Sequence, residues 1–173
     1  ISFAAGQNAV VMMDEDLTDL TLIDPRLVSM RQTTSADLLV LTSSSFIGTL
    51  ADPTNPASAN GIGVPLADKW VLTPQEQLAI KTATDAYNTI IEGVAASNPN
   101  VAMVDFKGVL QEASMGITFD DYTMTTNLAL GGLISLDGVH LTGRGYALMA
   151  NKIMAAMDAK FGSNFTTATN GLA

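Results

Sequence analysis

Asp137 and His140 are the residues whose types and spacing best suit chemistry in this sequence. His140 is the only histidine among the 173 residues, and Asp137 stands three positions before it, in the turn Asp137-Gly138-Val139-His140. At that spacing the carboxylate can reach the Nδ1–H of the imidazole, which leaves Nε2 to act as a base toward a serine hydroxyl. Two plainer interpretations stay open, because a lone histidine is often structural and Asp137 can simply cap the turn at Gly138. A carboxylate has two oxygens, so capping the turn and orienting the imidazole are compatible.

No serine stands in a recognised nucleophile motif, since neither Gly-x-Ser-x-Gly nor Ser-x-x-Lys occurs. The cluster Ser43-Ser44-Ser45 follows an apolar run, which is where α/β enzymes place catalytic groups. Serine clusters at strand ends are nevertheless more typical of turns and caps. Ser135 is too close to His140 along the chain to attack a substrate in line with it. The sequence therefore predicts catalytic roles for Asp137 and His140 without a nucleophile.

The residues favour neither a metal nor a cofactor. Asp14, Asp16 and Asp19 hint at calcium, but Thr18 breaks the EF-hand spacing, and the required Gly and terminal Glu are missing. The chain has no cysteine, which removes disulfides, thiolate catalysis and zinc–thiolate sites. We expect no metal, no cofactor and a solvated acidic turn.

Two helices are predicted, one at each end of the region from residue 73 to residue 162. Thr73-Pro74-Gln75-Glu76 is a capping box, and Asn98-Pro99 ends the first helix. The second begins after Thr142 and ends at Gly162, with a buried stripe expected along one face. The members of that stripe are Tyr146, Met149, Ala150, Ile153, Met157 and Phe161.

Between these helices the run Val101 to Phe106 is predicted to form a buried strand, followed by an amphipathic stretch from Gly108 to Ala113. Helix, strand and helix in this order favour a parallel α/β layer. We interpret residues 73–162 as the α/β core, residues 1–50 as a β-rich insertion with short apolar runs at 9–13 and 37–42, and residues 51–72 as a long loop that lines or covers a site.

Composition excludes several classes of protein. The hydrophobic fraction is 47% and the charged fraction 14%, which excludes disorder over most of the chain. A net charge of −9 repels phosphate backbones and makes nucleic acid an unsuitable partner. No apolar run approaches the ~20 residues of a membrane span, so we expect a soluble protein with no transmembrane segment.

The region around His140 resembles the last conserved block of the SGNH (GDSL-type) hydrolases. The resemblance is carried by Asp137-Gly138-Val139-His140-Leu141-Thr142, Gly143-Arg144-Gly145-Tyr146-Ala147 and Ala150-Asn151, although family members often have Pro where Leu141 stands. The stretch from Asp68 to Phe106 and the pieces Ala5-Gly6-Gln7-Asn8 and Arg31-Gln32 are also similar to an exported subgroup typical of Bacteroidetes. The resemblance implies a flavodoxin-like three-layer α/β/α fold, a secreted, periplasmic or outer-membrane-associated location, and hydrolysis of an acyl ester of lipid or glycan origin. In it, His140 is the base and Asp137 the residue that orients it.

The sequence departs from the family in one important respect. The family's Gly-Asp-Ser nucleophile motif, its oxyanion-hole glycine and its Gly-x-Asn-Asp asparagine are all absent, and Gly6-Gln7-Asn8-Ala9 is a poor match to the last. We therefore interpret residues 1–173 as the C-terminal portion of such a hydrolase domain, which needs an upstream half for the serine and the oxyanion hole. Helix faces carrying Ile90, Ile91, Ile153 and Met157 would then lack a sheet to cover them, so we expect that half to pack here as a second chain, or an oligomer to cover the same faces. The alternative is a non-catalytic extracellular acidic module that binds a partner.

Overall fold

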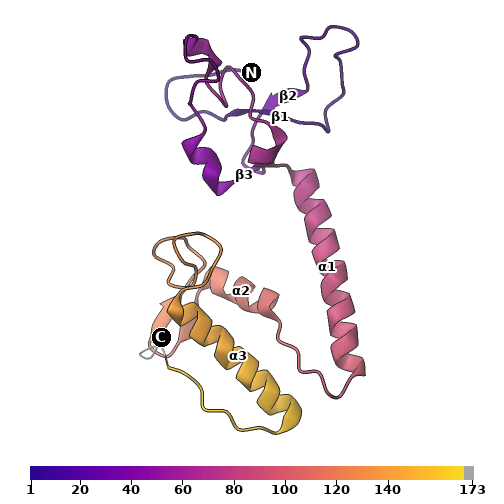
Figure 1. Ribbon diagram of the computed structural model, residues 1–173, viewed down its shortest axis with the longest axis vertical. Helices are drawn as coiled ribbons and strands as arrows, with labels where there is room; N and C mark the ends of the chain where they lie inside the picture. Colours follow the sequence, from indigo (N-terminus) through magenta and orange to yellow (C-terminus); the bar gives the residue numbers. More distant parts are fainter. Residues whose placement is uncertain (170–173) are drawn as a thin grey trace. The chain divides into compact units, whose positions relative to one another are not determined.

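The computed structural model describes residues 1–169 of a mixed α/β protein. Its main helices are α1 (Pro74–Ser97), α2 (Phe106–Met115) and α3 (Gly143–Phe161), labelled in Figure 1. The sheets of the described residues are small, each a pair of antiparallel strands. The chain divides into two compact units, Ile1–Asp85 and Ala86–Ala173, which are described separately below.

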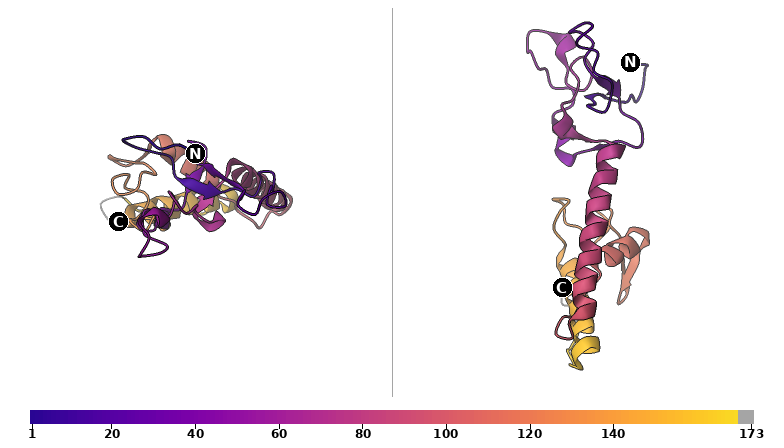
Figure 2. Two further views of the ribbon diagram at one scale, coloured as in Figure 1. Left: turned by 90° about the horizontal axis from the view of Figure 1, so that it is seen from above. Right: turned by 90° about the vertical axis from the view of Figure 1, so that its right-hand side faces the viewer.

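The start and end signals of α1 and α3 act as the sequence predicts. Thr73 Oγ1 accepts a hydrogen bond from the Glu76 amide at 3.3 Å, and Glu76 Oε2 accepts one from the Thr73 amide at 2.7 Å, which completes the capping box. At α3, the Thr142 hydroxyl accepts from the Gly145 amide at 3.0 Å, and Gly162 ends the helix with a left-handed φ of 69°. Figure 2 shows α1 as one unbroken helix. Its 24 residues, at a rise of 1.5 Å each, correspond to a length of about 36 Å.

The first unit is built on short strands. β1 (Val11–Met13) pairs with β2 (Met30–Gln32), and β3 (Leu38–Leu39) pairs with β4 (Val71–Leu72). The long loop between residues 51 and 72 contains two single-turn 3₁₀ helices, Pro56–Ser58 and Asp68–Trp70. The core of this unit comprises the buried side chains Met12, Leu66 and Val71, beside the stacked rings of Phe46 and Trp70, whose centroids lie 4.5 Å apart.

Arg31 on β2 joins two acidic residues into a partly buried ionic network. Its guanidinium donates to Asp37 through two nitrogens, at 2.7 and 2.6 Å, and also to Asp14. The Arg31 guanidinium holds the pKa of the Asp37 carboxyl well below its usual range, with help from the Thr34 amide and hydroxyl. Both carboxylates are buried, so the network ties β2 to the loops before and after it.

The second unit has a different core. α2 and α3 pack with a hairpin of β5 (Ile117–Phe119) and β6 (Tyr122–Met124), for which the sequence analysis gives no prediction. Asp120 makes its turn with a φ of 50°, a conformation that Asp adopts more readily than most residues. The core consists of Val109, Ala113, Ile117, Phe119, Met124, Leu133, Leu148 and Met149.

The predicted strand at 101–106 is wrong for the described structure. Residues 101–105 form no strand, and α2 already begins at Phe106. Asp105 causes this early start, because its side chain caps α2 by accepting from the Gly108 amide at 2.8 Å. The expected parallel layer therefore has no strand at this place.

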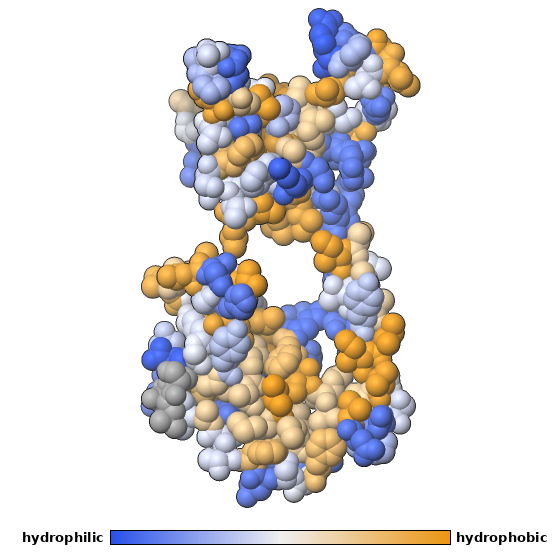
Figure 3. Space-filling view, viewed as in Figure 1, coloured by the Kyte–Doolittle hydropathy of each residue, from blue (hydrophilic) through white to orange (hydrophobic). Residues whose placement is uncertain are grey.

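The expected buried stripe of α3 is also largely wrong. Of the predicted stripe, Met149 is buried and Met157 half-buried, whereas Tyr146, Ala150, Ile153 and Phe161 are exposed. The other buried residues of the helix are Gly145 and Leu148. α1 has no buried residue at all, and Ile90 and Ile91 are 64% and 54% exposed. Figure 3 shows apolar side chains (orange) on the surface of the lower half of α1.

No helix among residues 1–169 is both long enough and apolar enough to cross a membrane.

Candidate active site

The loop from 132 to 142 holds the Asp137–His140 pair and is closed at its base by backbone bonds. Leu133 is fully buried in the core of the second unit. Its carbonyl accepts from the Thr142 amide at 2.9 Å, and the Ser135 amide donates to the His140 carbonyl at 2.8 Å. Gly138 takes a φ of 76° in the turn between them, a left-handed conformation that glycine adopts without strain. The turn is therefore a defined structure anchored to the core, seen beside the start of α3 in Figure 1.

Thr142 links this loop to α3. Its hydroxyl donates to the Gly132 carbonyl at 2.6 Å and also accepts from the Gly145 amide at the start of the helix. Two residues after Thr142, the Arg144 guanidinium lies 4.7 Å from the centre of the Tyr122 ring, in cation–π contact. The helix start and the loop are thus fixed to each other, and the turn that holds His140 is fixed with them.

Asp137 uses its two carboxylate oxygens for different purposes. Oδ1 accepts from the Ser135 hydroxyl at 2.7 Å and from the backbone amides of Val139 and His140, each at 2.9 Å. Oδ2 lies 2.7 Å from Nδ1 of His140. The Ser135 hydroxyl first, then the Val139 amide and the His140 side chain, hold the pKa of the Asp137 carboxyl well below its ordinary value of 3.8.

The pairing fixes the tautomer of His140. An ionised carboxylate only accepts hydrogen bonds, so the proton of the neutral ring lies on Nδ1 and Nε2 has a free lone pair. No described residue forms a hydrogen bond with Nε2, and the side chains of His140 and Asp137 are 70% and 50% exposed. The sequence prediction that these two residues form a pair at the start of α3 is confirmed by this geometry, in which Asp137 both caps the turn and contacts the imidazole.

The serines of the described chain do not complete a nucleophilic site. In the cluster at 43–45, the hydroxyls of Ser44 and Ser45 donate to the carbonyls of Leu41 and Thr42, and Ser43 is buried. The cluster belongs to a short 3₁₀ helix, Leu41–Ser45, in which these hydroxyls bond carbonyls three residues before them, so the serines have a structural role here as the sequence favours. The Ser135 hydroxyl is directed to Asp137 and not to the imidazole.

Ser135 is the residue of this site that the sequence reasoning missed. Its closeness to His140 in the sequence argues against a nucleophile but not against a bond to Asp137. A usable signal was present, because serine two positions before an aspartate that starts a turn is well placed to bond that carboxylate. The site is therefore a Ser–Asp–His chain of hydrogen bonds in which Ser135 lies at the far end from the imidazole.

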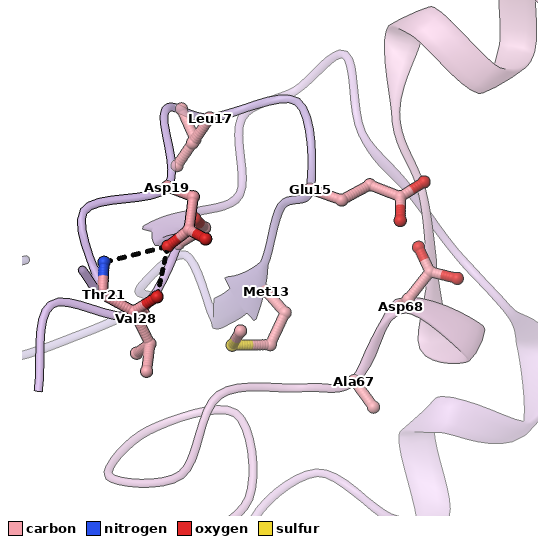
Figure 4. Close-up of a pocket in the computed structure, with 9 residues that line it drawn as sticks. Met13, Glu15, Leu17, Asp19, Thr21, Val28, Ala67 and Asp68 are labelled. Atoms are coloured by element: carbon pink, nitrogen blue, oxygen red, sulfur yellow. Dashed lines mark hydrogen bonds between the residues drawn. The ribbon is translucent and has the colours of Figure 1, made fainter. Parts of the chain in front are cut away.

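The first unit contains a separate hollow of about 540 Å³, shown in Figure 4. Its apolar lining includes Met13 and Leu17, and the Glu15 and Asp68 carboxylates face one another across one side. Asp19 and Thr21 also line the hollow, and the Asp19 carboxylate accepts hydrogen bonds from the amide and the hydroxyl of Thr21 at 2.9 and 2.6 Å.

Two of the aspartates in the acidic segment 14–19, Asp14 and Asp19, have hydrogen-bond partners within the first unit. The Asp14 side chain bonds Arg31 and the Asp16 amide. Among residues 1–169, no group of three or more His, Asp or Glu side chains is arranged to hold a metal ion.

No protein-family model, curated protein or solved structure matches this chain, so the assignment of its function depends on the geometry of the loop at 132–142.

Proposed function

We propose that this chain provides the base and its orienting carboxylate for a serine ester hydrolase of the SGNH type. The observation that carries the proposal is the 2.7 Å contact between Asp137 Oδ2 and His140 Nδ1, with Nε2 open to solvent. A histidine that serves as base in a serine hydrolase has this arrangement, because the carboxylate selects the tautomer and stabilises the imidazolium that forms. The exposed position of the ring supports a site that an additional segment completes.

In the proposed reaction, a serine from outside residues 1–173 attacks the ester carbonyl. Nε2 of His140 takes the proton of the serine hydroxyl during attack and returns it to the leaving alcohol. Water then hydrolyses the acyl-serine with the same base. Asp137 stays ionised throughout, for which its lowered pKa is well suited. The oxyanion donors come from the same outside segment as the serine.

The fold proposed for the complete enzyme is the flavodoxin-like three-layer α/β/α architecture, with this chain as its C-terminal part. The exposed apolar side chains of α1 support the proposal that a segment with further strands covers them, since exposed apolar area costs ~25 cal/mol per Å². We propose that this segment is the half with the nucleophile, bound as a second chain or as part of a longer one. Light scattering of the chain alone tests this, because uncovered α1 faces should cause self-association, whereas a stable monomer would contradict the proposal.

The proposed substrate is an ester with an apolar acyl group, of lipid or glycan origin. Leu136 and Val139 stand on either side of the Asp137 turn and are 79% and 74% exposed, which provides apolar contact surface next to the imidazole. We propose a secreted, periplasmic or outer-membrane-associated enzyme, following the resemblance to exported hydrolases.

A fluorophosphonate probe, which reacts with activated serines, tests the function. We expect no labelling and no p-nitrophenyl ester turnover with the 173-residue chain alone. A longer protein that joins this sequence to a Gly-Asp-Ser segment should be labelled at that serine, and His140→Ala should abolish the labelling. Asp137→Asn should lower kcat by about 10⁴-fold, the usual effect of losing the orienting charge.

Asp52→Asn is the matched control for Asp137→Asn. Like Asp137, Asp52 accepts hydrogen bonds from a backbone amide and a hydroxyl, here both of Thr54, and these bonds lower its pKa, but it contacts no imidazole. This variant should keep full activity. Labelling of the isolated chain at Ser44 that survives His140→Ala would overturn the proposal, as would a longer protein whose turnover is indifferent to His140→Ala.

The second candidate is a non-catalytic acidic module, and the hollow in Figure 4 is the observation that favours it. Apolar side chains with Glu15 and Asp68 at one side suit a partner that carries basic and apolar groups. If this function is right, Glu15→Gln weakens binding of such a partner, and the longer protein is not labelled by the fluorophosphonate probe.

A further inference from the structure

The Asp137 carboxylate is held from both sides of the turn in which it lies. Its Oδ1 takes two backbone amides from residues that follow it, Val139 and His140, and one hydroxyl from a residue that precedes it, Ser135. Oδ2 is the carboxylate oxygen that contacts the imidazole, whereas the other three hydrogen bonds of the carboxylate all go to Oδ1. Rotation of the carboxylate about χ2 would break the bonds at Oδ1 as well as the contact at Oδ2.

The Ser135 hydroxyl is itself well positioned for this bond. The Ser135 amide donates to the His140 carbonyl at 2.8 Å, and the Ser135 carbonyl accepts from the Gly138 amide at 3.0 Å. Both polar groups of its backbone are therefore bonded to the turn. The backbone closes the turn without the hydroxyl, so the hydroxyl is available for orienting the carboxylate.

We propose that Ser135 is a positioning residue, whose hydroxyl holds the Asp137 carboxylate in the orientation that presents Oδ2 to Nδ1 of His140. A role of Ser135 in catalysis rests on the proposed function, whereas the effect of Ser135 on the imidazole tautomer does not. Ser135 selects the Nδ1–H tautomer indirectly, by keeping the accepting oxygen in place. It does not touch the substrate or the nucleophile.

The test measures the tautomer of His140 by ¹H–¹⁵N correlation of the ring in the 173-residue chain, in mildly alkaline buffer where an ordinary imidazole is neutral. We expect the Nδ1–H form to dominate in the wild type. Ser135→Ala should shift the tautomer ratio toward Nε2–H by about three- to fivefold, as expected for loss of one hydrogen bond to a half-exposed carboxylate. Ser135→Thr keeps a hydroxyl and should restore the ratio.

Ser114→Ala is the matched control, because the Ser114 hydroxyl donates at 2.7 Å to a backbone carbonyl of α2 in the same unit. It should leave the ring spectrum unchanged. A Ser135→Ala ratio equal to that of the wild type would overturn the inference, and so would a shift that Ser135→Thr fails to restore. Loss of amide-exchange protection at Ser135 in the Ala variant would show that the hydroxyl closes the turn instead. No turnover is needed, so an inactive longer enzyme would refute the proposed function and leave this result standing.

Discussion

At Gly145, adding a single methyl group should weaken the packing of α3 against the loop that holds His140. It lies buried in the first turn of α3, and its amide donates to the Thr142 hydroxyl. A Cβ at Gly145 would stand 2.6 Å from the Leu133 carbonyl oxygen, 3.0 Å from Leu141 Cβ and 3.3 Å from Leu133 Cδ1. The first contact is with backbone, so a rotamer change cannot relieve it. α3 must move away from the loop that holds His140.

Two opposing contributions give the size of the effect. Overpacking by one methyl group costs about 1–3 kcal/mol. Replacing glycine by alanine in a helix contributes about 0.5–1 kcal/mol in the opposite direction. The net expectation for Gly145→Ala is a loss of about 0–2.5 kcal/mol in the free energy of unfolding, compared with ~5–15 kcal/mol for a typical domain.

Gly93→Ala is the matched control, because Gly93 is also helical, in α1, and a Cβ there would meet nothing within 4 Å. It should stabilise the chain by about 0.5–1 kcal/mol. Urea unfolding followed by circular dichroism at the helix band compares the two variants. A destabilising Gly145→Ala beside a stabilising Gly93→Ala supports the reasoning, whereas a Gly145→Ala that stabilises as much as Gly93→Ala would show that the close approach of α3 to Leu133 is absent.

Three further results are expected. Asp37→Asn removes the charge of one buried partner of Arg31, while Arg31 keeps its other partner, Asp14, and is itself partly exposed. The free energy of unfolding should therefore fall by about 2–3 kcal/mol, measured by urea unfolding followed with Trp70 fluorescence. A loss below about 0.5 kcal/mol would contradict the network. The pKa of Asp137 is lowered, so its contribution to stability is complete above its ordinary value of 3.8 and is lost as pH falls through the folded value; a ¹³C carboxyl titration with a midpoint at or above 3.8 would refute this. Thr142→Ala removes the N-cap of α3 and should cost about 1 kcal/mol by circular dichroism, and an unchanged midpoint would show that the cap is dispensable.

The features that the sequence predicted correctly depend on residues close together in the chain. The capping box at Thr73 and the stop at Gly162 define helix ends through hydrogen bonds and backbone conformation within one turn. The Asp137–His140 contact likewise spans three residues, so the turn alone brings the two side chains together.

Tertiary structure decided the features that depend on distant partners. A strand needs a neighbour to take its hydrogen bonds, and residues 101–105 have none in the described structure, whereas the hairpin at 117–124 forms because its two strands satisfy each other. The stripe of α3 was predicted from periodicity, but which side is buried depends on where Leu133 and the hairpin pack, and that side includes Gly145 and Leu148. Arg31 meets Asp14 across 17 positions of sequence, a distance over which spacing carries no information about contact. The sequence alone determined the helix ends and the Asp137–His140 contact, because their geometry is local, and the fold decided what surrounds them.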